Sequence, residues 1–508
     1  MLKSILSVGS FTLLSRVTGF VRDIVMAAVM GTGLVADAFV VAQRLPNHFR
    51  AIFGEGAFNS AFVPSYSKAL ETKGREAALL LAGRLMTMLM LAIGALTVAA
   101  FVWMPQFVAL LAPGFPGEPE KFSLAVTLTR ITFPYLFFIV LVTLLSGVLN
   151  AADRFAAAAA APVLLNVAMV AALAVAFLFP TAGHAAAWGV AAAGVLELAL
   201  LVVAAHRAGC LPRPRAVVFD ADIRRFFRTL GPAVIGAAGV QIAMFADTII
   251  ASLLPTGSVS SLYYADRLYQ LPVGVIGIAA GTVVLPTMAR RLALGDTAGA
   301  HGAQNRAMAF TVALAAPFFV AFLMIPELIM AALFMRGAFT ADSASAAGAA
   351  LAAYGVGLPA VVLIRSAVAS FHARQDTTTP LIASFSGIGV NLALKLVLYE
   401  PFGAPGLAFA TAIGAWVNVI LLVVLARRRD YMAPDRDLMR TVAAVAGCAA
   451  LLAAVTFVAG PLVRPWAAGF GGWAPLAHLG ALGTLGAVVY FGALLALVRV
   501  LRLPFRRA

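Results

Sequence analysis

Apolar runs of about twenty residues or more follow one another along this 508-residue chain, separated by short polar links. A helix of about 20 residues spans the hydrocarbon core of a bilayer, whereas a soluble domain has too little interior to bury so many such runs. With 62% hydrophobic and 11% charged residues, the composition agrees. The runs are continuous and lack the alternation of transmembrane β-barrel strands. The sequence therefore predicts an all-α polytopic membrane protein.

We expect about fourteen transmembrane helices. The expected spans are residues 4–29, 34–56, 78–112, 122–150, 158–180, 184–206, 229–254, 258–289, 304–335, 344–372, 379–399, 404–426, 437–462 and 474–502. When the loops are placed alternately on two sides, one side receives nearly all Lys and Arg, and the other receives only Lys121, Arg336 and Arg464. Lys and Arg favour cytoplasmic loops, so both termini are predicted to be cytoplasmic.

The longest polar link, residues 208–228, divides the chain. Prolines keep its first part extended, while Ile223, Phe226 and Phe227 beside arginines are typical of a short helix on the anionic inner leaflet. The expected organisation is a six-helix N-lobe (1–208), a cytoplasmic amphipathic linker (209–228), a six-helix C-lobe (229–430) and two C-terminal helices (431–508).

The two lobes carry similar features in the same order. These features are an acid, an arginine and a proline, namely Asp37, Arg44 and Pro46 in the second expected helix and Asp266, Arg267 and Pro272 in the eighth. This order favours a duplication. Because six is an even number of spans, the lobes would insert in the same orientation about a pseudo-two-fold axis along the membrane normal. Transporters built this way place the substrate site at the interface of the repeats.

Ionisable residues interrupt the first, second and eighth expected helices. They are Arg16, Arg22, Asp23, Asp37, Arg44, Arg50 and Glu55 near the N-terminus, and Asp266 and Arg267 in the eighth helix, where Ser260 and Tyr263 lie on nearby turns. A charge at the bilayer centre costs roughly 2.5–3.5 kcal/mol even on the lenient insertion scale. These side chains are therefore expected to face protein or a watery cavity.

Arginines outnumber acids in this set. One interpretation is that the charges form internal salt bridges, which only hold the helices together. The other is that the surplus arginines bind an anion, because a guanidinium forks onto phosphate oxygens and stays charged at any accessible pH. This favours a phosphate or diphosphate ligand, with the acids balancing arginines in the empty state or closing gates.

Further polar residues lie in the seventh, eleventh and twelfth expected helices. Asp247, Asn391 and Thr411 could supply oxygen ligands to a sodium ion, or Lys395 could be an internal cation that forms a salt bridge. Of these two interpretations, we favour the salt bridge.

Catalysis finds little support in the sequence. The six histidines are scattered without metal-ligand spacing, and no phosphate-binding loop is present, so neither a metal site nor ATP hydrolysis is expected.

Cys210 and Cys448 stand far apart and are expected to be inert core residues. The net charge of +15 is spread over short loops, which leaves no basic soluble domain for nucleic acid. Lys3 is followed by a run that Arg16 and Arg22 interrupt, so we expect a retained first helix and no cleaved signal.

Several motifs closely resemble the MurJ (MviN) family. They are S-R-x-x-G-F-x-R-D at Ser15 to Asp23, A-D-A-F at Ala36, R-L-P-N at Arg44, F-x-E-G-A-F at Phe53, G-S-V-S at Gly257, Y-Y-A-D-R-L at Tyr263 and R-Q-D at Arg374. The resemblance covers essentially the whole chain. It implies the fold of the multidrug/oligosaccharidyl-lipid/polysaccharide exporter superfamily and a location in the bacterial cytoplasmic (inner) membrane.

The resemblance also implies a function. Members of the family flip lipid II, the undecaprenyl-diphosphate-linked peptidoglycan precursor, to the periplasmic leaflet for cell-wall synthesis. By this resemblance, Arg16, Arg22, Arg50 and Arg267 match substrate-binding arginines, Asp37 and Glu55 match functional acids, and the last two helices would form the groove for the polyprenyl tail. Lys395 departs from what a cation site would prefer.

The sequence therefore predicts a flippase that works by alternating access, without a required cofactor. The rivals are a flippase for another polyprenyl-diphosphate oligosaccharide, a drug or cation antiporter of the same superfamily, a membrane scaffold for the cell-wall machinery and, least supported, an enzyme acting on polyprenyl carriers. An antiporter should present acids and aromatic residues to a cationic ligand, and a scaffold should tolerate loss of the arginines.

Overall fold

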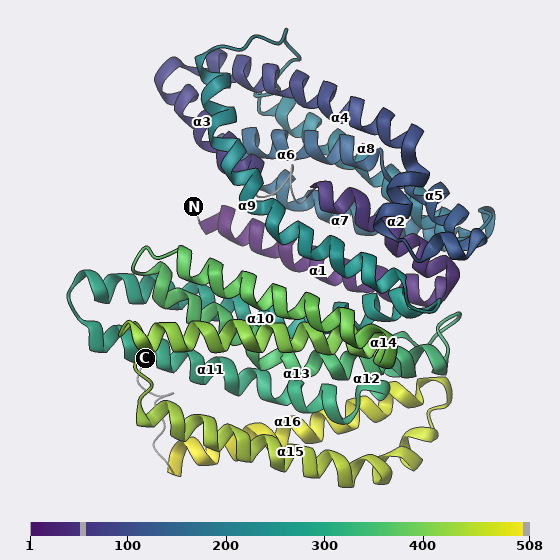
Figure 1. Cartoon of the computed structure of the whole chain (residues 1–508), viewed down its shortest axis with the longest axis vertical. Helices are drawn as coiled ribbons and strands as arrows, with labels where there is room; N and C mark the ends of the chain where they lie inside the picture. Colours follow the sequence, from purple (N-terminus) through teal and green to yellow (C-terminus); the bar gives the residue numbers. More distant parts are fainter. Residues whose placement is uncertain (1, 51–56, 501–508) are drawn as a thin grey trace. The chain divides into compact units, whose positions relative to one another are not determined.

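The computed structural model describes residues 2–50 and 57–500, and every regular element in these ranges is a helix (Figure 1). The expected all-α class is confirmed. The chain divides into two compact units. They are Met1–Ser260 with Gly337–Phe339, and Ser261–Arg336 with Thr340–Ala508.

The first unit is a bundle in which neighbours in sequence mostly pack together. Its helices are α1 (Leu2–Met30), α2 (Leu34–Arg50), α3 (Ala57–Lys73), α4 (Arg75–Leu111), η2 (Phe115–Gly117), α5 (Pro119–Thr132), α6 (Tyr135–Ala151), α7 (Phe155–Ala174), η3 (Ala176–Leu178), α8 (Ala182–Arg207) and α9 (Ala221–Ser252). The helix α7 packs on both α1 and α8, α2 packs on α5, and α3 packs on α9.

The second unit holds the remaining helices. They are α10 (Ser258–Ala293, whose first residues belong to the first unit), α11 (Thr297–Met324), α12 (Pro326–Phe334), α13 (Ala341–His372), α14 (Thr378–Arg428), α15 (Arg436–Ala468), η4 (Gly471–Trp473) and α16 (Ala474–Val500). The helices α15 and α16 pair with each other and pack on α11 and α12 (Figure 1).

Most expected spans coincide with helices, although their number stays a prediction. In the described ranges, nine helical segments are long and apolar enough to cross a membrane. The helices α1, α2, α9 and α10 are not among them. These four helices carry most of the ionisable candidate residues.

The helix boundaries differ from two of the expectations, and a proline or a glycine lies at each difference. The expected span 122–150 is α5 and α6, separated at Phe133 and Pro134. The expected spans 379–399 and 404–426 are both contained in α14, which leaves helical geometry at Gly403 (φ 56°, ψ −138°). Positive φ is a conformation that glycine adopts readily, so α14 bends at Gly403.

The interval 57–77, which links two of the expected spans, is largely helical. It contains α3, whose Phe58, Phe62 and Tyr66 are buried at a four-residue spacing. The ring centroids of Phe58 and Phe62 lie 5.2 Å apart, and those of Phe62 and Tyr66 lie 5.6 Å apart. Apolar residues at this spacing form the buried face of an amphipathic helix. The polar residues between them kept the segment from being predicted as a helix.

The expected leaflet-lying segment is the beginning of α9. Asp220 accepts a hydrogen bond from the Ile223 backbone N–H and starts the helix. Ile223 and Phe226 are buried, and the Phe226 ring contacts that of Phe58 at 5.7 Å. For these two side chains the membrane-surface expectation is wrong, because their apolar face packs on α3; Phe227 is exposed.

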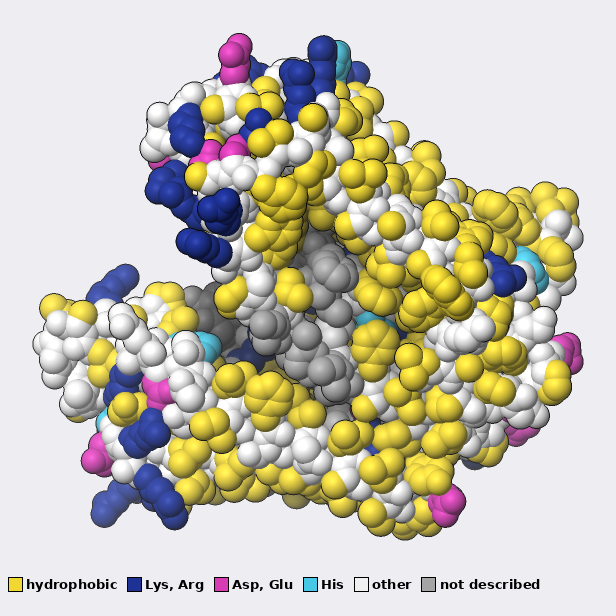
Figure 2. Space-filling view, turned by 45° about the horizontal axis from the view of Figure 1, so that its top comes forward, with side chains coloured by type: hydrophobic (Ala, Val, Ile, Leu, Met, Phe, Trp, Pro, Cys, Tyr) yellow, Lys and Arg dark blue, Asp and Glu magenta, His cyan; other side chains and the backbone are white. Residues whose placement is uncertain are grey.

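Large hydrophobic side chains remain exposed over long stretches of both units, as lipid-facing surfaces require. On α4, Val98 and Leu110 are 66% and 72% exposed, and on α15 Phe457 is 73% exposed. Figure 2 shows hydrophobic side chains covering most of the visible face, with Lys and Arg gathered mainly at one end of each unit.

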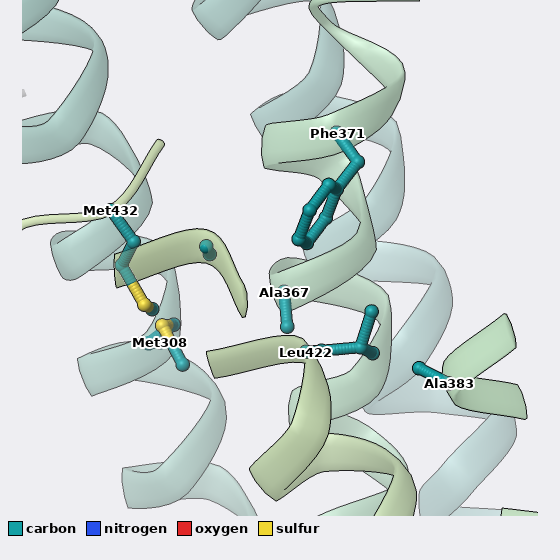
Figure 3. Packing of buried hydrophobic residues seen from close by; sticks show 7 residues of the cluster. Met308, Ala367, Phe371, Ala383, Leu422 and Met432 are labelled. Carbon is teal, nitrogen blue, oxygen red and sulfur yellow. The ribbon is translucent and has the colours of Figure 1, made fainter. Parts of the chain in front are cut away.

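The second unit has a tight core where α11, α13 and α14 meet. Met308, Ala367, Phe371, Ala383, Leu422, Ala426 and Met432 are all buried there. Figure 3 shows Met308 beside Met432, and Phe371 lying along the helix that carries Ala367. Small residues on α13 and α14 let the helix backbones approach, a common way to pack helices inside a membrane.

Asp376 joins the two ends of α14. Its carboxylate accepts hydrogen bonds from the Thr379 backbone N–H (3.0 Å) and hydroxyl (2.7 Å), and from Arg429 Nη1 (2.6 Å) just beyond the last turn. The bend at Gly403 lets the two ends meet. The hydrogen bonds from Thr379, together with the Arg429 charge, lower the pKa of Asp376 below its usual 3.8.

We predict that Asp376→Ala destabilises the purified protein by about 1–2 kcal/mol, because α14 loses its N-terminal cap and Arg429 loses its partner. Thermal unfolding in detergent measures this. Since the pKa of Asp376 is lowered on folding, its contribution is complete above the ordinary value of 3.8 and is lost as pH falls through the lower folded value. The penalty should therefore be equal at pH 6 and pH 8. Asp342→Ala, an exposed acid in the first turn of α13, is the matched control and should cost less; equal losses would contradict the capping role.

Candidate functional site

The candidate residues of the first unit lie on α1, α2 and α9, together with the first residues of α10. Their charges fall into three groups, around Arg22, Arg44 and Asp37.

Arg22 is buried and joins α1 to α7. Its Nη2 and Nε donate to Asp23 Oδ1 at 2.7 and 3.1 Å, and its Nη1 donates to Asn166 Oδ1 at 3.0 Å. Asn166 in turn donates to the Ser15 carbonyl at 3.0 Å. The side chains of Arg22 and Asp23 are 9% and 5% exposed. The structure thus brings together two predicted site residues and a third, Asn166, that was not among the candidates.

Arg16 lies one and a half turns before Arg22 and is exposed. In the described part of the chain it has no hydrogen-bond or ion-pair partner. The two arginines therefore differ in their surroundings. The charge of Arg22 is balanced by Asp23, whereas Arg16 is accessible to a ligand.

Arg44 and His48 connect α2 to α9. Arg44 Nη1 donates to Thr248 Oγ1 at 3.1 Å, and His48 Nδ1 donates to Gln241 Oε1 at 3.0 Å. Arg50, at the end of α2, is half-buried and donates to Asn47 Oδ1 at 3.3 Å. Glu55, another candidate, lies outside the described residues.

Asp37 has no exposed surface and is surrounded by donors. Its Oδ1 accepts hydrogen bonds from the Ser260 backbone N–H (2.8 Å) and hydroxyl (2.6 Å), and its Oδ2 accepts one from the Gly257 backbone N–H (2.7 Å). These donors stand at the start of α10, where N–H groups have no partner within the helix. Ser260, predicted to bind substrate, is here a partner of Asp37.

Lys121 stands beside Asp37 and was not a candidate, since the sequence placed it in an external loop. It is 1% exposed, and its Nζ lies 3.8 Å from Asp37 Oδ2. It also donates to Glu118 Oε1 at 3.0 Å and Thr256 Oγ1 at 2.9 Å, and it lies 4.4 Å from the centroid of the Phe115 ring. Lys121 therefore ties the start of α5 to α2 and to the link before α10.

Glu197 is a second charged residue that the sequence analysis passed over. It is 1% exposed in the middle of α8, and Tyr135 Oη donates to its Oε2 at 3.3 Å. The positive charge of Arg50 attracts the Glu197 carboxylate. The signal was present in the sequence, because Glu197 interrupts a long run of Ala, Leu and Val.

In the second unit, α10 carries the other candidates. Arg267 is exposed, with its guanidinium 4.8 Å from the centroid of the Tyr263 ring, one turn earlier. Asp266 accepts a hydrogen bond from Gln270 Nε2 at 3.3 Å. The ring face of Tyr263 stabilises the planar cation and holds it in position.

The residues of the cation-or-salt-bridge hypothesis fall in both units. Thr411 Oγ1 lies 3.5 Å from Asn391 Oδ1, and Lys395 is buried on the same helix one turn from Asn391. Asp247 belongs to the first unit. Among the described residues, no group of three or more His, Cys, Asp or Glu could hold a metal ion. Both the favoured salt bridge and the sodium ion stay predictions.

Chemically, the arrangement suits binding rather than bond-breaking. The buried charges are held by fixed partners, whereas the guanidiniums of Arg16 and Arg267 are exposed. Cys210 and Cys448 are buried free thiols, in keeping with their expected place in the core. Planar exposed guanidiniums favour bidentate contacts with phosphate or carboxylate oxygens.

Comparisons with known proteins agree in family and in fold. A family model described as lipid II flippase MurJ matches residues 26–473. The probable lipid II flippase MurJ of Rhizobium meliloti is 42% identical over 464 residues, which are 90% of this chain and 86% of that protein. The lipid II flippase MurJ of Burkholderia cenocepacia is 34% identical over 458 residues, which cover 89% and 88% of the two chains.

Two solved structures share the fold. A lipid II flippase MurJ in an inward closed conformation has a TM-score of 0.80 at 23% identity and covers 97% of this chain and 99% of its own. A multidrug resistance MATE family transporter of the MOP superfamily has a TM-score of 0.68 at 15% identity, over 84% and 97% of the two chains.

We predict that Lys121→Met destabilises the first unit by about 3–5 kcal/mol, because the Asp37 carboxylate keeps its burial and loses the nearby cation. Thermal unfolding of the purified protein measures the loss. The double variant Asp37→Asn/Lys121→Met should lose less than the sum of the two single variants, which a double-mutant cycle detects.

Lys68→Met, which removes an exposed lysine from α3, serves as the control and should leave stability nearly unchanged. If Lys121→Met unfolds at the wild-type temperature, or if the double variant is strictly additive, Lys121 and Asp37 do not act as a pair.

Proposed function

This chain belongs to the lipid II flippase MurJ family, and on that premise we propose that it moves lipid II from the inner to the outer leaflet of the bacterial cytoplasmic membrane. Lipid II carries a diphosphate between its polyprenyl tail and its sugar-peptide head. The proposed role is to supply this precursor to peptidoglycan synthesis. The protein is thus a transporter, and we expect no covalent chemistry and no ATP hydrolysis from it.

One observation carries the proposal: the guanidiniums of Arg16 and Arg267 are exposed, whereas Arg22 and Asp37 are buried. An exposed guanidinium can form bidentate contacts with the oxygens of a diphosphate. We assign Arg16 and Arg267 to the diphosphate, with Arg50 and Arg22 as further contacts. Arg22 also positions α1 through Asp23 and Asn166.

We propose alternating access as the mechanism. Asp37 is assigned to a closing contact, because its three hydrogen bonds to Gly257 and Ser260 fix α2 to the start of α10. Breaking these bonds would leave Asp37 beside Lys121, which reduces the cost of the change. Glu55, Arg44, Asp23 and Asp266 are assigned to gating or charge balance, and α15 and α16 to the polyprenyl tail.

The first rival is a flippase for another polyprenyl-diphosphate oligosaccharide, which would use the same diphosphate contacts. A drug or cation antiporter is disfavoured, since exposed arginines repel a cationic ligand. A scaffold for the cell-wall machinery would need the arginines only for stability. Sodium at Asn391 and Thr411 is retained as an alternative to a salt bridge by Lys395, and contact with cell-wall enzymes is a further expectation.

We predict that Arg16→Ala and Arg267→Ala each reduce lipid II flipping at least about tenfold, because each removes a charge-assisted contact worth about 1.5–3 kcal/mol. Lysine at either position should restore part of the rate, since the charge returns without the planar fork. Exposure of fluorescent lipid II at the far leaflet of proteoliposomes measures the rate.

Arg440→Ala, at an exposed position near the start of α15, is the matched control and should flip lipid II normally. Wild-type flipping by Arg16→Ala and Arg267→Ala, with the loss confined to loop variants, would instead support the scaffold.

We also predict that both termini are cytoplasmic. In a background where Cys210 and Cys448 are replaced by Ser, a new cysteine at Arg215 should react with a membrane-impermeant maleimide only after the cells are opened. A cysteine at Glu120, in the first turn of α5, should react in intact spheroplasts. The reverse labelling pattern would overturn the orientation, and labelling of both positions from one side would overturn the number of spans between them.

A further inference from the structure

A cavity of about 620 Å³ lies in the second unit, where the turn between α11 and α12 meets the end of α15 and the start of α16. Its floor is apolar, with Met324, Ala331, Ala468 and Leu482 among the lining residues. Two charged side chains, Glu327 and Arg464, complete the lining. None of these residues belongs to the site assigned to the diphosphate.

The two charges of the cavity have opposite signs and are free. Glu327 stands in the first turn of α12, Arg464 lies near the end of α15, and both are exposed. Within residues 2–50 and 57–500, neither one has a hydrogen-bond or ion-pair partner. The nearby Arg336 differs, because it donates to the carbonyls of Leu333 (2.7 Å) and Ala332 (3.3 Å) at the end of α12. The cavity thus offers one cation and one anion to a ligand.

The walls of the cavity are held in place. His478 on α16 donates from Nε2 to the Gly460 carbonyl on α15 at 3.1 Å, and both residues line the cavity. Near the cavity, the Arg336 guanidinium lies 5.4 Å from the centroid of the Trp473 ring.

Aromatic side chains mark the depth of the cavity in the membrane. Trp466, Phe470 and Trp473, at the turn between α15 and α16, are 57%, 50% and 63% exposed. Tryptophan concentrates where lipid head groups meet hydrocarbon. Earlier in α15, Phe457 and Leu462 are more than 70% exposed, as expected for residues that face acyl chains. The cavity therefore lies at the boundary of head groups and hydrocarbon.

We propose that this cavity binds one bilayer aminophospholipid, with its phosphate on Arg464 and its primary ammonium on Glu327. A zwitterionic head group matches the two free charges, and the apolar floor accommodates the upper part of the acyl chains. Inorganic phosphate would leave Glu327 unused. A polyprenyl diphosphate would bring two negative groups next to the Glu327 carboxylate. The bound lipid would fasten α15 and α16 to α12, and it is distinct from the transported lipid.

Native mass spectrometry of the full chain tests the proposal, using phosphatidylethanolamine and phosphatidylglycerol with identical acyl chains in equal amounts. We expect one phosphatidylethanolamine per chain, retained at least about tenfold better than phosphatidylglycerol, a difference of about 1.4 kcal/mol. Arg464→Gln and Glu327→Gln should each abolish the preference. Arg440→Gln, at the other end of α15, is the matched control and should keep it.

A second pair of variants guards against misfolding. Ala468→Phe fills the cavity and keeps both charges, while Ala454→Phe adds the same ring at an exposed position of α15 outside the cavity. Added phosphatidylethanolamine should raise the unfolding temperature of wild type and Ala454→Phe, and not that of Ala468→Phe.

Three results would overturn the proposal. Equal retention of both lipids would show that the ammonium is not recognised. Equal loss of the lipid in Arg440→Gln would show nonspecific electrostatics. Displacement of the phospholipid, one for one, by undecaprenyl diphosphate would assign the cavity to the substrate tail. Flipping by Glu327→Gln at the wild-type rate would leave the proposed transport function intact, so the two proposals can fail separately.

Discussion

A carboxylate with no exposed surface sets the local structure around α2. Burying an unpaired charge costs several kcal/mol, so Asp37 can remain ionised only where donors enclose it. Gly257 and Ser260 supply those donors, and Lys121 adds a nearby cation from a segment far away in the sequence. The positions of α2, the start of α5 and the link before α10 therefore depend on one another, and a change at one must be accommodated at the others.

The same reasoning separates the arginines into two kinds. Arg22 is enclosed by Asp23 and Asn166, so its charge is balanced and its effect is to hold α1 against α7. Arg16 and Arg267 are exposed. The proposed transport of a diphosphate uses both kinds: buried charges that maintain the helices in an apolar environment, and exposed ones that bind the substrate. The proposed function rests on this separation.

The fold class could be predicted because a bilayer imposes one constraint on every span: its backbone hydrogen bonds must be satisfied over about 20 apolar residues. A run of apolar residues that meets this constraint can be recognised in the sequence one segment at a time. The amphipathic helix α3 was not predicted, because polar residues from its other face separate Phe58, Phe62 and Tyr66 in the sequence. The short motifs identified the family correctly. Lys121 could not have been found, because its partners Asp37 and Thr256 are separated from it by many residues and only folding brings them together.

The central claim is that exposed guanidiniums bind a polyprenyl diphosphate. The most direct measurement is native mass spectrometry of the purified protein with undecaprenyl diphosphate and with undecaprenol, which has the same tail and no phosphate. The account predicts a one-to-one complex with the diphosphate that is lost in Arg16→Gln and in Arg267→Gln, and no comparable complex with undecaprenol. Equal binding of both compounds, or undiminished binding by both variants, would contradict it.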